Sequence, residues 1–113
     1  MKFHLTTGLG FTAPDGLDTS ENFDSFTDSV TDELFELEDV NENISDSDVA
    51  ASLTDRTMNV SMVIEAETGN DAAMFFLNTV RTALHAAGGG TESWPEFKTT
   101  RGLTRDGIEL ADA

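Results

Sequence analysis

The sequence predicts a single α+β domain in which one antiparallel sheet packs against two helices. Three observations lead to this prediction. Apolar and polar residues alternate from residue 2 to residue 11, apolar residues recur at helical spacing in two later segments, and a two-residue apolar period surrounds residue 55. The 113 residues are enough for one core and too few for two domains, so we expect residues 1–113 to fold as one unit.

The first element is expected to be a half-buried strand over residues 2–11. One side of the strand carries Phe3, Leu5, Leu9 and Phe11, and the other side carries Lys2, His4, Thr6 and Gly8. The segment 13–16, Ala-Pro-Asp-Gly, predicts a turn, because proline fixes one backbone angle and glycine accepts the opposite sign of another. Gly8 and Gly10 predict a bulge or a close backbone contact within the strand.

A long amphipathic helix should follow, and either Asp18 or Ser20 can cap its first turn. Its buried stripe repeats every three or four residues over about five turns. The stripe consists of Phe23, Phe26, Val30, Leu34 and Leu37. The acidic segment 39–48, which is rich in Asn and Ser, is expected to be a connection.

A hairpin is predicted around a two-residue tip at Asp55 and Arg56. Its register rests on three apolar pairs, Leu53 with Met58, Ala51 with Val60, and Val49 with Met62. The other face of the hairpin holds Ala50, Ser52, Thr54, Thr57, Asn59, Ser61, Val63 and Glu65. Asp-Arg is not a favoured pair for such a tip, which leaves a longer loop as the alternative.

The segment 69–71, Gly-Asn-Asp, ends the hairpin and begins a second amphipathic helix, which Gly88 ends. The buried stripe of this helix is Ala73, Phe76, Leu77, Val80, Leu84 and Ala87. Residues 94–113 are the least defined part of the chain. An alternation at Phe97, Thr99, Arg101 and Leu103 favours a closing strand, and Asp-Gly at 106–107 predicts a turn before Ile108 and Leu110.

The expected order is therefore strand, helix, strand, strand, helix, strand. This order resembles the ferredoxin-like βαββαβ pattern, in which an antiparallel sheet carries both helices on one face. The resemblance covers most of the chain at the level of fold and includes no family motif. Because this fold hosts many unrelated functions, the resemblance implies no particular one.

Charge limits the partners of this domain more than it limits the fold. Against 6 basic residues stand 22 acidic ones, which gives a net charge of -16, and no Lys or Arg occurs from residue 3 to residue 55. Such a field disfavours direct contact with nucleic acid or an anionic membrane. The chain has no cysteine, which excludes disulfides and thiol chemistry. Its first residues lack the apolar run of a signal peptide, so a cytoplasmic location is expected.

One set of acidic residues follows a helical spacing. Asp24, Asp28, Asp32 and Glu36 recur every four residues and should line one solvent-facing strip of the first helix. We interpret this acidic stripe as a solvated face, which suits a protein adapted to salt. The alternative is an acidic decoy that occupies a DNA-binding protein, because its carboxylates rise about 6 Å per step, near the spacing of phosphates along a nucleic-acid strand.

No pattern in the sequence supports a metal site, a cofactor or catalysis. The segment 46–48, Asp-Ser-Asp, is not followed by the glycine and final glutamate of a calcium loop, and no serine lies in a nucleophile elbow. Neither His4 nor His85 has a partner at a spacing that makes it a general base. We therefore expect a non-enzymatic protein. The alternative is a small-molecule sensor or enzyme that uses a cleft on the sheet face, with His4 as the base.

The sheet face away from the helices is the predicted interaction surface. Its lining is small and mostly uncharged, and it consists of His4, Thr6, Ala50, Ser52, Asn59, Ser61 and Val63. Charged residues are depleted from interface cores, so we expect a homodimer or another protein partner on this face. A further hypothesis concerns a basic C-terminal segment, Lys98, Arg101 and Arg105, which would meet the acidic region of the same or a neighbouring chain.

Overall fold

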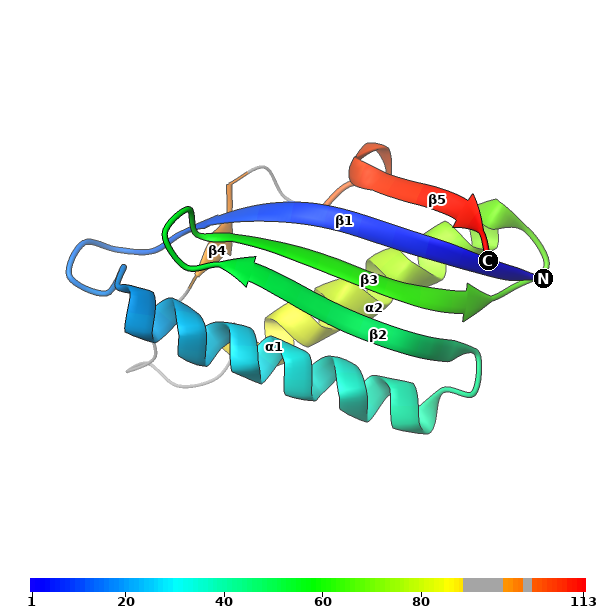
Figure 1. Cartoon of the computed structure of the whole chain (residues 1–113), viewed down its shortest axis with the longest axis horizontal. Coiled ribbons are helices and arrows are strands. Elements are labelled where there is room, and N and C mark those ends of the chain that lie inside the picture. Colours follow the sequence, from blue (N-terminus) through cyan, green and yellow to red (C-terminus); the bar gives the residue numbers. More distant parts are fainter. Residues whose placement is uncertain (89–96, 101–102) are drawn as a thin grey trace.

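The computed structural model describes residues 1–88, 97–100 and 103–113, with residue 98 described by its backbone alone. Along the chain, β1 (Lys2–Thr12) leads to α1 (Ser20–Val40), and β2 (Ile44–Ser52) and β3 (Thr57–Glu65) form a hairpin. Then come α2 (Gly69–Gly88), the short β4 (Lys98–Thr99), the 3-10 helix η1 (Arg105–Gly107) and β5 (Ile108–Asp112). Figure 1 shows α2 behind the sheet and α1 along the side of β2.

The sheet is antiparallel throughout, in the order β2, β3, β1, and the far edge of β1 is shared by β5 and β4. β5 pairs with β1 from Phe3 to Thr7, whereas β4 pairs with Phe11 and Thr12. The predicted α+β class is confirmed, and the order of the elements agrees with the ferredoxin-like βαββαβ pattern.

The core lies between the sheet and the two helices and follows the predicted alternation. On β1 the buried side chains are Phe3, Leu5, Leu9 and Phe11, while Lys2, His4 and Gly8 are exposed. The helices contribute the buried residues Phe23, Phe26, Val30 and Leu34 from α1 and Ala73, Phe76, Leu77 and Val80 from α2. The helices therefore cover one face of the sheet and leave the other face open.

Four phenylalanines pack together at one end of this core. The ring centroids of Phe11 and Phe23 are 5.7 Å apart, and those of Phe26 and Phe97 are 5.4 Å apart. Such aromatic pairs contribute about 0.5–1.5 kcal/mol each beyond the area that they bury. Because Phe97 immediately precedes β4, this cluster holds β4 against the end of β1.

The register of the hairpin differs from the prediction by two residues. Ala51 pairs with Met58 and Val49 pairs with Val60, so both residues keep their predicted face but pair with positions two residues nearer the start of β3. The cause is a four-residue turn over residues 53–56, so the longer loop, which was the alternative, replaces the two-residue tip. The side-chain period of two explains why a shift of two residues preserves the apolar face.

Arg56 holds the longer turn closed. Its backbone takes a φ of 54°, and its guanidinium donates to the carbonyl oxygen of Leu53 and to the carboxylate of Asp18, with Nε 2.6 Å from Oδ1. Asp18 is therefore not the helix cap. Thr19 caps α1 instead, because its hydroxyl oxygen accepts a hydrogen bond from the backbone N–H of Asn22 at 3.1 Å.

β2 begins at Ile44, within the segment 39–48 that was expected to be a connection. A β-bulge between Ser45 and Asp48 makes this possible, with Asp46 at a φ of 54°. Ile44 stays buried on the core face and pairs with Ile64. The acidic composition of the segment concealed a strand in which Asp46 and Asp48 are exposed.

The C-terminal segment is also arranged differently from the prediction. Within the described residues, the expected strand over 97–103 is limited to Lys98 and Thr99, and Arg101 lies outside the described residues. Ile108 and Leu110 belong to β5 and lie beside Thr7 and Leu5 of β1. Two short strands thus occupy the sheet position that one closing strand was expected to fill.

Candidate interaction face and glycine trough

We use the term open face for the sheet surface opposite the helices. The strand register places all seven residues of the predicted interaction surface on it, and none of them is buried. They are His4, Thr6, Ala50, Ser52, Asn59, Ser61 and Val63. Their positions follow from the alternation, because successive residues of a strand point to opposite faces of the sheet.

Paired residues cross the open face in rows. His4 lies between Val63 on β3 and Ala111 on β5. The next row holds Thr6 beside Ser61, and its two outer positions are Glu109 on β5 and Asp48 on β2. The centre of the face is thus formed by hydroxyls, small apolar groups and one imidazole.

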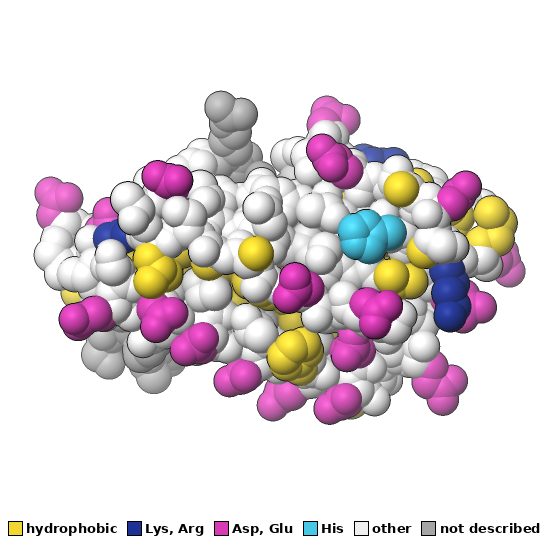
Figure 2. Space-filling view, viewed as in Figure 1, with side chains coloured by type: hydrophobic (Ala, Val, Ile, Leu, Met, Phe, Trp, Pro, Cys, Tyr) yellow, Lys and Arg dark blue, Asp and Glu magenta, His cyan; other side chains and the backbone are white. Residues whose placement is uncertain are grey.

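Charged side chains stand at the margin of the open face. Lys2 and Glu65 are paired at one end, Asp48 lies on the outer strand β2, and Glu109 lies on β5. All four are exposed. Figure 2 views this face and shows a largely uncharged middle with one histidine to its right, and most acidic side chains lie along the lower edge, where Figure 1 places α1.

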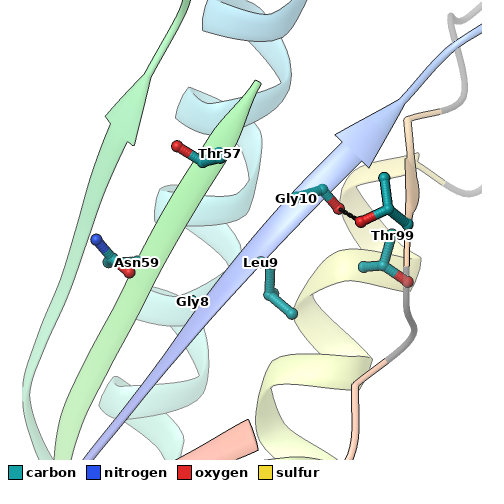
Figure 3. A pocket seen from close by; sticks show the side chains of 7 residues that line it. Gly8, Leu9, Gly10, Thr57, Asn59 and Thr99 are labelled. Carbon is teal, nitrogen blue, oxygen red and sulfur yellow. Dashed lines mark hydrogen bonds between the residues drawn. The ribbon is translucent and has the colours of Figure 1, made fainter. Parts of the chain in front are cut away.

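A hollow of about 420 Å³ indents the open face at the end where β4 joins the sheet. We call it the glycine trough. Its described lining is Gly8, Leu9, Gly10, Thr57, Asn59, Thr99 and Thr100, none of which is charged. Figure 3 shows Thr57 and Asn59 on one side of the β1 glycines and Thr99 on the other.

The trough exists because two successive positions of β1 on this face lack a side chain. A Cβ at Gly8 would lie 3.0 Å from Oδ1 of Asn59, and a Cβ at Gly10 would lie 3.1 Å from Oγ1 of Thr100. The pairing of Gly8 and Gly10 with β3 is continuous, so the predicted bulge is wrong, and the atoms that crowd both glycines belong to side chains, not to the backbone. The sequence alone could not identify the trough, because Thr100 reaches Gly10 only through the fold.

Hydrogen bonds to β1 hold Thr100, one of the residues that line the trough. The carbonyl oxygen of Gly10 accepts from the backbone N–H of Thr100 at 2.9 Å and from its hydroxyl at 3.4 Å. On the side of β5, the buried hydroxyl of Thr7 donates to the carbonyl oxygen of Gly107 at 3.0 Å. The two bonds from Thr100 fix the wall of the trough beside Gly10.

The acidic stripe lies where its spacing predicts. Asp24, Asp28, Asp32 and Glu36 are all exposed on α1. Within the described part of the chain, the ion pair that the structure contains is Arg56 with Asp18, and it does not involve the stripe. The stripe is therefore an exposed surface of one sign on α1, separate from the residues of the open face, which lie on the strands.

The basic C-terminal segment and the two histidines were the other predicted candidates. Arg105 is exposed in η1, Arg101 lies outside the described residues, and only the backbone of Lys98 is described. His85 is exposed on α2, and His4 does not line the trough. In the described ranges, no three side chains are placed to share a metal ion, and no helix has both the length and the apolar character needed to cross a membrane.

Comparisons with known proteins add no relative. No family model matches the chain, and neither a curated protein nor a solved structure is similar to it at a significant level. The geometry of the open face is thus the basis for assigning a function.

Proposed function

We propose that this chain is a small acidic protein-association module, without catalytic activity, that pairs with a second copy through the open face. The distribution of charge carries the proposal, because the centre of the face is uncharged on a chain with a net charge of -16. Interface cores are depleted in charged residues and are surrounded by a polar rim. A cytoplasmic location is part of the same proposal.

The size of the open face supports this use. Strands about 4.8 Å apart that rise about 3.4 Å per residue give four strands of about nine residues an area of roughly 600 Å². Two copies would then bury about 1,200 Å² in total, which is the lower end of the range for specific interfaces. A dimer of moderate affinity is the expected result.

The edges of the sheet are less suited to association than its face. At one edge, β2 carries the bulge between Ser45 and Asp48, with Asp46 and Asp48 both exposed. Bulges and charges on edge strands prevent pairing with another sheet. At the other edge β5 has only five residues. A second copy therefore fits better against the open face than beside it.

A charge placed at the centre of the open face tests the proposal. We expect the wild-type protein to show twice its chain mass of 12.2 kDa in light scattering at micromolar concentration. The substitution Ser61→Glu should give the single-chain mass, because two like charges would be buried together. Ser25→Glu adds the same charge to the exposed surface of α1 and should leave the dimer intact. A wild-type protein of single-chain mass contradicts the proposal.

The acidic stripe supports a second candidate, the acidic decoy. Its four carboxylates are exposed, and none of them belongs to the ion pair found among the described residues. A decoy needs such an accessible row of negative charge. Capture of a DNA-binding protein that is lost when the stripe is changed to Asn and Gln would favour this candidate over the dimer.

The glycine trough supports a third candidate, a small-molecule sensor. Its volume of about 420 Å³ lies within the 300–1,000 Å³ that is typical of ligand sites. His4 is absent from the lining, so the trough favours binding over base catalysis. A small molecule that raises the melting temperature of the Ser61→Glu variant would favour this candidate.

A further inference from the structure

We propose that in the dimer the His4 side chain of each protomer occupies the glycine trough of its partner. This inference rests on the proposed function and specifies how the two open faces meet. Among the seven residues of the open face, His4 has the largest side chain and is exposed. The trough is the hollow on the same face, and Gly8 forms part of its floor.

Symmetry links these two features. In a two-fold dimer the same patch serves both copies, so a projecting group and the hollow that receives it must lie at equal distances from the axis. Thr6 lies midway between His4 and Gly8 on β1. We place the two-fold axis between the two sheets, perpendicular to the strands, so that it passes over Thr6. Rotation about this axis brings His4 of each copy above Gly8 of the other.

The spacing of packed sheets leaves room for this arrangement. Two sheets pack about 10 Å apart with interdigitating side chains, and a glycine on one sheet gives space to a long side chain from the other. The strands of two aligned sheets cross at about 30°. A residue two positions from the axis is therefore shifted sideways by about 3 Å relative to the facing strand. That displacement stays within the reach of an imidazole.

The chemistry of the trough also fits an imidazole. A neutral imidazole has one N–H donor and one nitrogen acceptor. The trough offers the carboxamide of Asn59, which both donates and accepts, and the hydroxyls of Thr57 and Thr100. No charged side chain belongs to the described lining, so an anion or a cation would have no counterion there.

A double-mutant cycle on the dimer dissociation constant tests this inference. Within one chain, His4 and Asn59 are four rows apart on the sheet, about 13 Å, too far for direct coupling. If they meet across the interface, His4→Ala and Asn59→Ala should each weaken the dimer about tenfold. The dissociation constant of the double variant should then also rise about tenfold, not a hundredfold, because both substitutions remove the same contact.

Two controls make the outcomes distinct. His4→Gln keeps a donor and an acceptor, so its dimer dissociation constant should stay within about threefold of the wild-type value. His4→Ala combined with Thr82→Ala, a change at an exposed position of α2, should have the same dissociation constant as His4→Ala alone. If the double variant is weakened by the product of the two single effects, the inferred position of His4 is wrong, although the dimer itself is still supported. A wild-type protein that shows no dimer at all would overturn the proposed function and this inference together.

Discussion

Arg56 joins three parts of the molecule through one side chain. Its guanidinium binds the carboxylate of Asp18 before α1, donates to the carbonyl of Leu53 in the hairpin turn, and lies 6.0 Å from the ring centroid of Phe23. The Arg56 side chain is 17% exposed, whereas that of Asp18 is 42% exposed. The ion pair is therefore partly screened by water, and the better-buried contacts of Arg56 contribute more to stability.

Replacing Arg56 should destabilise the fold. We expect Arg56→Ala to lower the free energy of unfolding by about 1–3 kcal/mol, because the turn loses its closing hydrogen bonds and the Phe23 ring its cation. Urea unfolding followed by circular dichroism measures this loss. Arg81→Ala, which removes a cation from the exposed side of α2, should change stability by less than about 0.5 kcal/mol. Equal effects of the two substitutions would show that Arg56 has no special structural role.

The helix α1 combines a well-buried face with a face of unfavourable charge. Phe23, Phe26 and Val30 are buried, which stabilises the helix through tertiary packing. Opposite to them, the carboxylates of the acidic stripe follow one another every four residues. Each like-charged pair at this spacing costs a few tenths of a kcal/mol. The helix is thus formed despite its charge pattern, by the burial of its apolar residues.

One charge reversal in the stripe should make the protein more stable. Asp28→Lys turns two repulsive pairs, with Asp24 and Asp32, into attractive ones, so we expect a gain of about 0.5–1 kcal/mol at low salt. The gain should shrink as salt is added, since exposed charges are screened. Asp28→Asn, measured by the same thermal unfolding, should gain about half as much. A loss of stability would mean that Asp28 makes a favourable contact.

How far the elements could be predicted depends on the range of the interactions that form them. The alternation on β1 and the stripes of α1 and α2 are local patterns, and the structure confirms them. The hairpin register was predicted wrongly because a bond between Arg56 and Asp18, far apart in the chain, favours the longer turn. Composition also concealed the start of β2, where a bulge allows Asp46 to face the solvent.

The candidate site also combines features set by local sequence patterns with features set by contacts between distant segments. The seven residues of the open face follow from strand period and could be assigned from the sequence. The glycine trough could not, because it requires Asn59 from β3 and Thr100 from the C-terminal segment to flank the same glycines of β1. Such a hollow depends on the register of three chain segments at once.

At the scale of the whole molecule, net charge opposes association. Two copies with a charge of -16 each repel one another, and Glu109 and Asp48 would each lie near their own copies along the proposed axis. Raising NaCl from about 10 mM to about 1 M shortens the screening length from about 30 Å to about 3 Å. We therefore expect the dimer dissociation constant, measured by sedimentation equilibrium, to fall as salt rises.

The variant Glu109→Gln sharpens the salt experiment. It should tighten the dimer at low salt and reduce the salt dependence, because it removes a like charge from each open face. Glu33→Gln on α1 changes the net charge equally and serves as the control. A dimer that weakens with salt would contradict face-to-face pairing and favour docking of the basic C-terminal segment on an acidic region.

The pairing of β5 with β1 also bears on how the chain folds. The hydrogen bond from Thr7 to Gly107 joins residues 100 positions apart, and contacts of such separation form slowly. Until residues 108–112 dock, one edge of β1 is free to pair with another unfolded or partly folded chain. The short β5 thus protects the chain from edge-to-edge aggregation, a role that begins during folding, before any dimer exists.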